Sequence, residues 1–291
     1  MPGVRQAEVV SDERVVAVWR DGAAVPAPPD EPVLSAFDLG LIRGDGAFET
    51  VAVLDATLPH LDAHLARMAN SAALLDLADP GPDAWRALTA AVLERWPAAV
   101  EGACRLILTR GLATGLPPTA LAVLSPVSEE TLRQRSDGIS VVTLGLGVPA
   151  DFRSRAPWLL GGAKTLSYAV NMAALRHAVT LGADDVVFTS LEGQILEGPT
   201  STVVWACGGT LHTPPVETGI LPGTTMARLF ARAAAAGRPT AFTAGTVEDL
   251  HAADAVWLVS GVRSAATVHT LDGVARGDAG LSGGVVELLG R

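Results

Sequence analysis

The feature of this chain that most restricts its fold is the order of its apolar segments. Short apolar runs typical of strands are mixed with longer segments in which apolar residues recur at helical spacing. The two kinds do not alternate strictly, which suggests an α+β (mixed α/β) fold. We predict strands at 14–20, 47–54, 104–110, 119–125, 139–146, 185–190, 202–207 and 255–260, and helices at 60–77, 84–96, 164–181 and 225–236.

A polar stretch after Pro126 separates two groups of these segments. A chain of 291 residues fits one large domain or two medium ones. We therefore predict a smaller N-terminal α/β domain over residues 1–125, a connector over 126–138 and a larger C-terminal domain over 139–291.

The charge of the chain restricts its partners. The net charge is −10 and no basic cluster stands out, which argues against nucleic acid or an anionic membrane and leaves a small-molecule substrate. The N-terminus lacks the apolar core of a signal peptide, and no run approaches about 18 apolar residues, so we expect a cytoplasmic protein. Cys104 and Cys207 lie outside any zinc-binding spacing, so we expect reduced thiols and no metal site.

The chain contains one lysine, Lys164, beside 20 arginines. A site that needs a deprotonatable amine cannot replace lysine with arginine, because guanidinium stays protonated. The small residues at 161–163 leave room for a bulky ligand. A desolvated amine has a lowered pKa, so it can attack an aldehyde and carry protons. The alternatives are an exposed lysine at a helix start and a chance survivor of coding bias.

Three further features are able to bind a cofactor. Glu197 lies between a hairpin and a buried strand, where a carboxylate needs a partner such as a pyridinium nitrogen. The loop at 219–225 leads into a helix, and helix N-terminal amides with threonine hydroxyls bind phosphate. Arg67, in the pattern His64-x-x-Arg67, adds a cation. The alternatives are a glutamate facing water, helix capping by Thr224 and a solvated surface arginine.

The order and spacing of these segments resemble the class IV (fold-type IV) pyridoxal 5'-phosphate (PLP) enzymes. That family includes branched-chain aminotransferase, D-amino-acid transaminase and aminodeoxychorismate lyase, and the resemblance extends over about residues 14–272. The matching segments are RGDGAFET (43–50), HLARM (64–68), LTRG (108–111), AKTLSYAVN (163–171), LEGPTSTVV (196–204), GILPGTT (219–225) and LVSGVRSA (258–265). The resemblance implies two domains with PLP in the cleft between them, cofactor binding by the larger domain, and a homodimer.

The resemblance also implies roles for individual residues at the cofactor. Lys164 corresponds to the catalytic lysine that forms the Schiff base with PLP. Glu197 corresponds to the acid at the pyridine nitrogen. Arg67 and Thr225 correspond to the residues that hold the phosphate, with the amides of Thr224 and Ile220 beside them.

On the substrate side, the resemblance points to the turn formed by Ser260, Gly261 and Val262. It also implies that Phe48 and Glu49 line the pocket from the smaller domain.

One position departs from the branched-chain enzymes, which carry a tyrosine five residues after the lysine. That position is Ala169 here, and the chain's only tyrosine is Tyr168. A helical spacing of four would place Tyr168 on the face of Lys164. Whether it substitutes there for the missing tyrosine or makes no contact with the cofactor is left open by the sequence.

The residues after the TRG turn narrow the choice of reaction. D-amino-acid transaminases carry an Arg-x-His carboxylate trap there, whereas this chain continues with Leu-Ala-Thr-Gly at 112–115. The segment RGDGAFET resembles the lyase and D-amino-acid branch, and the stretch AKTLSYAVNMAALRHA (163–178) resembles aminodeoxychorismate lyases. The resemblance therefore implies a 4-amino-4-deoxychorismate lyase that releases pyruvate and 4-aminobenzoate, a folate precursor. The alternative is a class IV aminotransferase for D- or branched-chain amino acids, and dual activity stays open. A bidentate guanidinium suits a carboxylate, and the candidates are Arg43, Arg110 and Arg263.

A protein of another class, a non-catalytic binding protein on the same scaffold, is the remaining rival. The retention of Lys164, Glu197 and the phosphate loop together argues against it.

Overall fold

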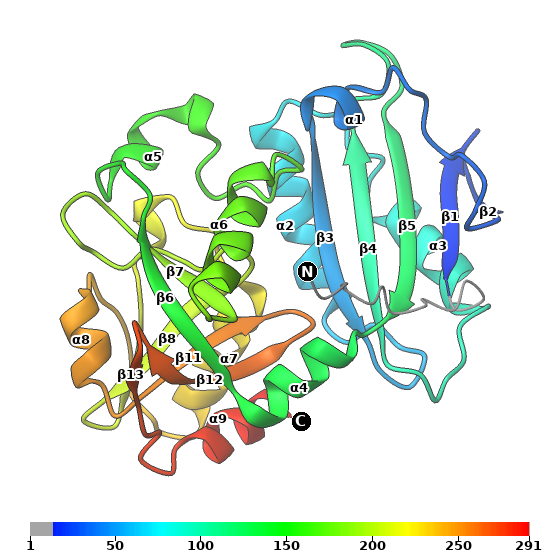
Figure 1. Ribbon diagram of the computed structural model, residues 1–291. Coiled ribbons are helices and arrows are strands. Elements are labelled where there is room, and N and C mark those ends of the chain that lie inside the picture. The colour runs from blue at the N-terminus through cyan, green and yellow to red at the C-terminus, as the bar shows by residue number, and fades with distance from the viewer. Residues whose placement is uncertain (1–13, 291) are drawn as a thin grey trace, which may run out of the picture.

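Two β-sheets, built by successive halves of the chain, organise the structure (Figure 1). The structure is a computed structural model that describes residues 14–290. The first sheet is antiparallel and has the strand order β2-β1-β5-β4-β3. Its strands are β1 (Val15–Arg20), β2 (Ala23–Ala27), β3 (Gly46–Val53), β4 (Gly102–Thr109) and β5 (Thr119–Pro126). The helices of this half are α1 (Leu39–Arg43), α2 (Leu61–Leu74) and α3 (Pro82–Leu93).

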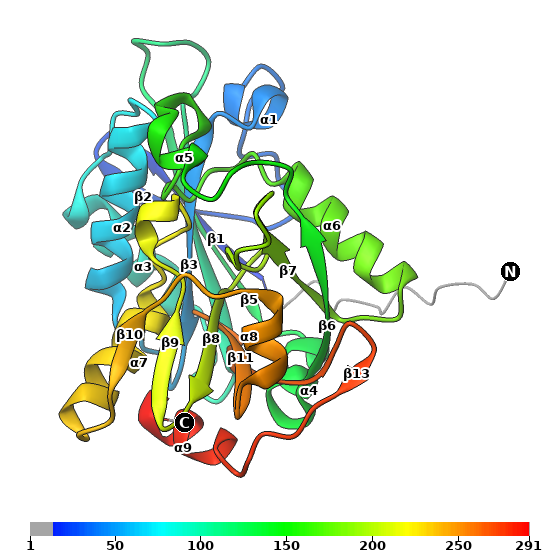
Figure 2. The ribbon, with the colours of Figure 1, turned by 90° about the vertical axis from the view of Figure 1, so that its left-hand side faces the viewer.

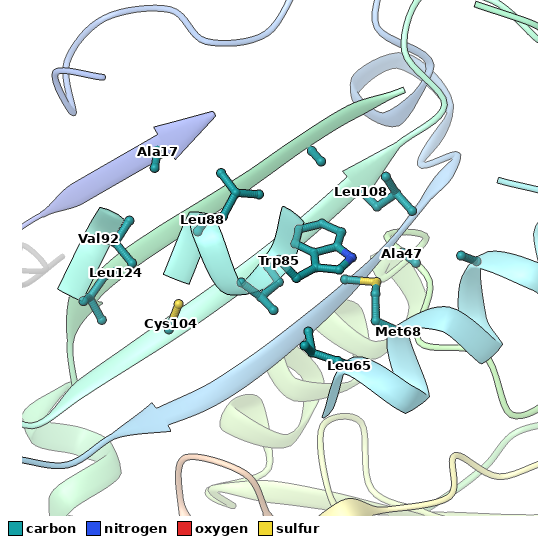
Figure 3. Packing of buried hydrophobic residues seen from close by; sticks show 14 of the residues in the cluster. Ala17, Ala47, Leu65, Met68, Trp85, Leu88, Val92, Cys104, Leu108 and Leu124 are labelled. Carbon is teal, nitrogen blue, oxygen red and sulfur yellow. The ribbon is translucent and has the colours of Figure 1, made fainter. Parts of the chain in front are cut away.

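Helices α2 and α3 cover one face of the first sheet (Figure 3). Leu65 and Met68 of α2 and Trp85 and Leu88 of α3 point into a core shared with the strands. Complete burial of a side chain such as Leu88 stabilises the fold by about 2 kcal/mol. The buried side chains of α2 position this helix against β3. Both elements carry residues of the site described below.

The second sheet is mixed, with the order β10-β9-β8-β11-β12-β6-β7 and β13 paired to β12. Its strands are β6 (Ile139–Gly145), β7 (Asp185–Thr189), β8 (Thr202–Cys207), β9 (Thr210–Thr213), β10 (Thr240–Phe242), β11 (Ala255–Ser260), β12 (Ser264–Leu271) and β13 (Val274–Ala275). The helices of this half are α5 (Phe152–Arg155), η2 (Pro157–Leu159), α6 (Ala169–Thr180), η3 (Val216–Thr218), α7 (Thr224–Ala235), α8 (Val247–Ala252) and α9 (Ser282–Leu289). Figure 2 shows α7 and α9 together at one end of this sheet and α6 at the other.

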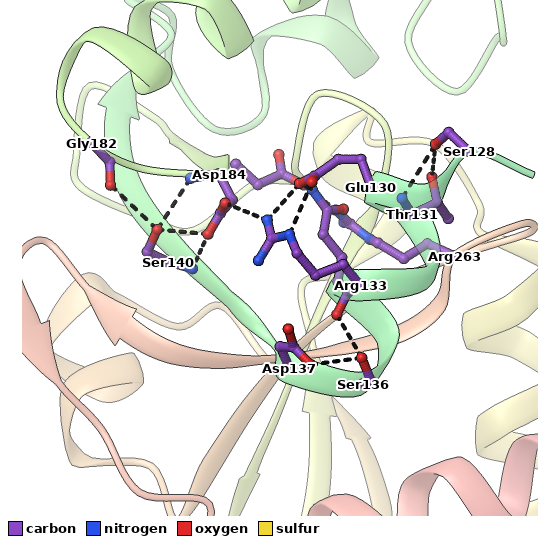
Figure 4. A network of polar contacts seen from close by, with 12 residues as sticks. Ser128, Glu130, Thr131, Arg133, Ser136, Asp137, Ser140, Gly182, Asp184 and Arg263 are labelled. Carbon is purple, nitrogen blue, oxygen red and sulfur yellow. Dashed lines mark hydrogen bonds and ion pairs between the residues drawn. The ribbon is translucent and has the colours of Figure 1, made fainter. Parts of the chain in front are cut away.

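Helix α4 (Glu129–Asp137) links the two sheets, within the segment that the sequence indicated as a connector. Arg133 of α4 pairs with Glu130 on the same helix and with Asp184 before β7 (Figure 4). Asp184 in turn accepts hydrogen bonds from the backbone and hydroxyl of Ser140 at 2.7 Å each. The linking helix is therefore fastened to the first strands of the second sheet.

The predicted α+β class is confirmed, and each of the predicted strands and helices has a counterpart. Pro26 is tolerated within β2 because β2 is an edge strand. One local prediction is wrong. The helix expected to begin near Lys164 begins at Ala169, because the residues before it pair with β3.

Candidate active site

Lys164 lies in an extended segment that pairs with the edge of the first sheet. The backbone N–H of Phe48 donates to the carbonyl of Lys164 at 3.0 Å, and that of Leu166 donates to Gly46 at 2.8 Å. The N–H of Lys164 donates to Ser71 Oγ on α2 at 3.0 Å. The backbone of the lysine is thus held by two elements of the N-terminal half.

The side chain of Lys164 is buried beside two aromatic rings. Its Nζ lies 4.4 Å from the centroid of the Phe48 ring and donates a hydrogen bond to the Tyr168 hydroxyl at 3.3 Å. Burial, and then the charge of Arg67, lower the pKa of Lys164 from 10.5 to about 8, although two nearby carboxylates act in the opposite direction. At neutral pH this amine is far easier to deprotonate than an exposed lysine.

Tyr168 faces Lys164, but not through the helical spacing that the sequence suggested. Tyr168 precedes the first residue of α6, and its N–H donates to the carbonyl of Leu166 at 2.8 Å. Its ring packs edge-on against Phe48, with the centroids 5.1 Å apart. Burial raises the pKa of Tyr168 to about 12, so the phenol keeps its proton beside the amine at neutral pH.

The carboxylate of Glu197 is held at both oxygens. Oε1 accepts a hydrogen bond from Nη1 of Arg153 at 2.9 Å, and Oε2 accepts one from the backbone N–H of Leu221, also at 2.9 Å. Arg153 belongs to the short helix α5 and is a site residue that the sequence did not reveal. The pair fixes the acid beside the loop that leads into α7.

The loop at 219–225 ends in the first turn of α7. Gly219 adopts a φ of 78°, which favours glycine, and Ile220 is buried. Thr224 and Thr225 are the first two residues of the helix, and Thr225 is buried. The N-terminal amides of α7 and these two hydroxyls therefore form an arrangement suited to an anion.

Arg67 pairs with Glu49, a contact that the sequence did not reveal. Its Nε and Nη2 donate to the two carboxylate oxygens of Glu49 at 2.6 and 2.8 Å. Its Nη1 donates to the carbonyl of Pro222 in the loop before α7 at 3.1 Å. A guanidinium has five N–H groups, so two remain for an anion at that loop.

Glu49, His64 and Arg67 form one buried group, which we call the Glu49 cluster. His64 Nδ1 lies 2.7 Å from Glu49, and His64 Nε2 lies 3.4 Å from the hydroxyl of Thr224. Burial alone would raise the pKa of Glu49, but the hydrogen bonds from Arg67 and His64 outweigh burial and lower it to about 2. Glu49 is fully buried and holds the Arg67 guanidinium. It does not line the pocket, contrary to the expectation from the sequence.

The turn between β11 and β12 contains Ser260, Gly261 and Val262 and lies against the Glu49 cluster. A Cβ on Gly261 would lie 2.8 Å from the carbonyl of Thr50 and 3.4 Å from Cε1 of His64, so a larger residue would push the turn away. The carbonyl of Val262 accepts a hydrogen bond from the guanidinium of Arg135 on α4 at 2.5 Å. The turn is therefore fixed between the two sheets.

Two of the three arginines expected at the substrate carboxylate have other partners, and we correct both assignments. Arg110 forms an ion pair with Asp45 at 2.6 Å, and its other nitrogens donate to backbone carbonyls after α2. Arg263 is buried and pairs with Asp185 at 2.7 Å beneath α4, beside the network of Figure 4. Arg43 is exposed at the end of α1, next to the segment that follows Lys164.

Within residues 14–290, no group of three or more His, Cys, Asp or Glu side chains is arranged to hold a metal ion. In the same range, no helix combines the length and apolar character needed to cross a bilayer. Cys104 is buried and Cys207 is exposed, and neither forms a disulfide.

Comparison with known proteins identifies the family of this chain. Residues 46–271 match the model of the amino-transferase class IV family. A bifunctional aminodeoxychorismate lyase / D-amino acid transaminase of Mycobacterium tuberculosis is 47% identical over 254 residues, which cover 84% of this chain and 88% of that protein.

Solved structures agree as well. A hypothetical aminotransferase from M. tuberculosis, in a PLP-bound form, has a TM-score of 0.91 and 44% identity, with 94% of this chain and 97% of that chain covered. A fold IV transaminase from Curtobacterium pusillum has a TM-score of 0.88 and 39% identity, with 95% and 97% covered. The chain therefore belongs to the class IV aminotransferase family, and its cofactor is pyridoxal 5'-phosphate.

Proposed function

We propose that this enzyme is a 4-amino-4-deoxychorismate lyase that forms 4-aminobenzoate and pyruvate. The observation that carries the proposal is the buried Lys164 amine, 3.3 Å from the Tyr168 hydroxyl, in a relative of an enzyme named for this reaction. Transamination of D-amino acids is the second candidate, because the same M. tuberculosis relative is named for both activities.

The described residues fit PLP at three points. PLP, when bound, provides an aldehyde that amines attack and a protonated ring that accepts electrons. The Lys164 amine suits the aldehyde, and the carboxylate of Glu197, held by Arg153, suits the ring nitrogen. The first turn of α7 and the two remaining N–H groups of Arg67 suit the phosphate.

Lys164 is the group that moves the substrate proton in this proposal. Its Nζ, when neutral, accepts a proton from the substrate carbon that carries the amine and later returns it as an acid. Tyr168, 3.3 Å from Nζ, orients the amine during both transfers. In the lyase reaction, loss of that proton and departure of pyruvate leave an aromatic ring.

The lowered pKa of Lys164 predicts how quickly the apoenzyme takes up its cofactor at different pH. Only the neutral amine attacks the aldehyde, and its fraction rises as the pH passes through about 8. We expect the rate of appearance of the yellow holoenzyme, followed by visible absorbance, to rise with a midpoint near pH 8 and to level off above it. A rate that keeps rising toward pH 10.5, the ordinary value for lysine, would contradict the buried environment of the amine.

Arg43 is the arginine that we propose for the substrate carboxylate. It ends α1, and the following Gly44 accepts a hydrogen bond from Ser167, the neighbour of Tyr168, at 3.1 Å. Among the described residues, no hydrogen bond or ion pair engages its side chain, unlike those of Arg110 and Arg263.

We expect Arg43→Gln to raise KM for the carboxylate substrate by about tenfold and to change kcat little, because the contact is the same in the ground and transition states. Steady-state kinetics would measure both constants. Arg20→Gln, an exposed arginine at the end of β1, is the matched control and should leave KM unchanged. An unchanged KM in Arg43→Gln would remove this residue from the site.

One assay distinguishes the two candidate reactions. The holoenzyme is incubated with 4-amino-4-deoxychorismate, and in parallel with D-alanine or L-leucine plus 2-oxoglutarate. Formation of 4-aminobenzoate supports the lyase. Turnover of the keto acid without 4-aminobenzoate would overturn the lyase proposal and leave the transaminase.

A further inference from the structure

A cavity of about 520 Å³ opens between α2, α7 and the end of α9. Arg67, Thr224 and Thr225, the groups suited to the cofactor phosphate, form its inner end. Lys164 and Glu197 do not line it. From Thr224 to Arg232 the lining of the cavity follows α7 for two further turns, about 12 Å, so the cavity extends beyond the phosphate position.

Two guanidinium groups lie at the outer end of the cavity. Among the residues that the structure describes, no aspartate or glutamate lines the cavity, although the whole chain has a net charge of −10. Its basic lining residues are His60, His64, Arg67, Arg228 and Arg232. Glu49 pairs with two of them, Arg67 and His64, at the inner end. Arg228 and Arg232 are four residues apart, so they lie on one face of α7 at the outer end.

Two details locate these charges. Arg232 donates one hydrogen bond from Nη1 to the carbonyl of Leu288 at 3.0 Å, which holds its guanidinium beside the end of α9. Burial, and then the charges of Arg228 and Arg232, lower the pKa of His60, so the imidazole across the cavity senses both guanidinium groups. Apolar side chains also line the cavity, namely Leu54, Pro59, Met226 and Leu289.

We propose that the outer end of this cavity is a second anion site, separate from the site of the cofactor phosphate. It takes a small molecule with a phosphate or carboxylate head on an apolar body. The head binds Arg228 and Arg232, because guanidinium groups recognise both anions by charge-assisted hydrogen bonds. The body lies on the apolar lining, and the volume is within the range of small-molecule sites.

The test uses the holoenzyme, in which PLP fills the phosphate position at the inner end. Titration calorimetry at constant ionic strength compares phenyl phosphate, benzoate and phenol. We expect binding of phenyl phosphate, benzoate or both, with the difference showing which head is preferred, and no binding of phenol.

Variants locate that binding. Arg232→Gln and Arg228→Gln should each weaken the charged probe about tenfold or more, the loss expected for one hydrogen bond to a charged group. Arg238→Gln is the matched control, because Arg238 lies just after α7, outside the cavity, and also donates to a backbone carbonyl, that of Gly209 at 3.3 Å. It should bind like the wild type.

Several outcomes would overturn the proposal. These are no binding to the wild type, equal binding of phenol, or unchanged affinity in Arg228→Gln and Arg232→Gln. The visible absorbance of PLP is recorded for each variant. Loss of PLP from Arg232→Gln would assign that arginine to the cofactor site and would also overturn a separate second site.

Discussion

Replacing Lys164 with alanine should abolish catalysis and the yellow colour of the enzyme without weakening the fold. Proton transfer by a positioned side chain contributes about 10²–10⁴-fold to rate, so we expect a loss of about 10³-fold or more. Lys164 is the only lysine, so no neighbouring lysine is able to replace it at the cofactor. Steady-state kinetics and the visible spectrum after addition of PLP measure both effects.

The thermal midpoint of the apoenzyme separates this result from misfolding. The Lys164 amine is buried and its pKa is lowered from 10.5 to about 8, so it costs stability as the pH falls below 10.5, and the full cost is present below about pH 8. Its removal should therefore leave the midpoint unchanged or raise it. Lys164→Arg keeps the charge but provides no deprotonatable amine and should also be inactive. Residual yellow colour and turnover in Lys164→Ala would show that Lys164 is not the cofactor lysine.

Glu49→Gln should be the most destabilising conservative change in the site. Glu49 is fully buried and accepts hydrogen bonds from Arg67 and His64. An amide of the same shape leaves the Arg67 guanidinium without its counter-charge, and loss of one partner of a buried pair costs about 3–5 kcal/mol. Urea unfolding should show a lower midpoint with an unchanged slope.

Two comparisons make this prediction specific. Glu130→Gln removes an exposed carboxylate that pairs with Arg133 and should cost about 1 kcal/mol or less. Unfolding measured over a series of pH values tests how the contribution of Glu49 to stability depends on pH. The pKa of Glu49 is about 2 instead of 4.5, so its contribution, about 3 kcal/mol, is present above pH 4.5 and is lost as the pH falls toward 2. The difference between wild type and Glu49→Gln should shrink over that window, and a constant difference would contradict the ionised cluster.

The sequence predicted the class of fold and the elements around the site because both depend on local patterns. Lys164, Glu197 and the loop at 219–225 occur in segments of recognisable order. In the structure the charge of Glu197 acts on the Lys164 amine, and Glu197 accepts a hydrogen bond from Leu221 in that loop. Helix α6 was predicted too early because residues 164–166 pair with a strand more than 100 residues away. Such pairing overrides the local preference for helix, and a local sequence pattern cannot predict a contact between segments so far apart.

The ion pairs of the site could not be predicted from the sequence for a related reason. Arg153 and Glu197 are 44 residues apart, and Arg67 and Glu49 are 18 apart, with no spacing that marks either pair. A guanidinium pairs with whichever carboxylate the fold brings near. Arg110 illustrates the opposite error, since its guanidinium suited a substrate carboxylate but the structure pairs it with Asp45.

The pairing of residues 164–166 with β3 has a consequence for how the halves of the molecule separate. Strand β3 is the last strand of its sheet, and an open edge invites pairing with foreign strands. Here the segment around Lys164 shields the start of that edge through two backbone hydrogen bonds. If the two halves separate at this contact, the edge of β3 is exposed and the Lys164 amine is displaced in the same event. Loss of activity and onset of aggregation should therefore occur in one transition.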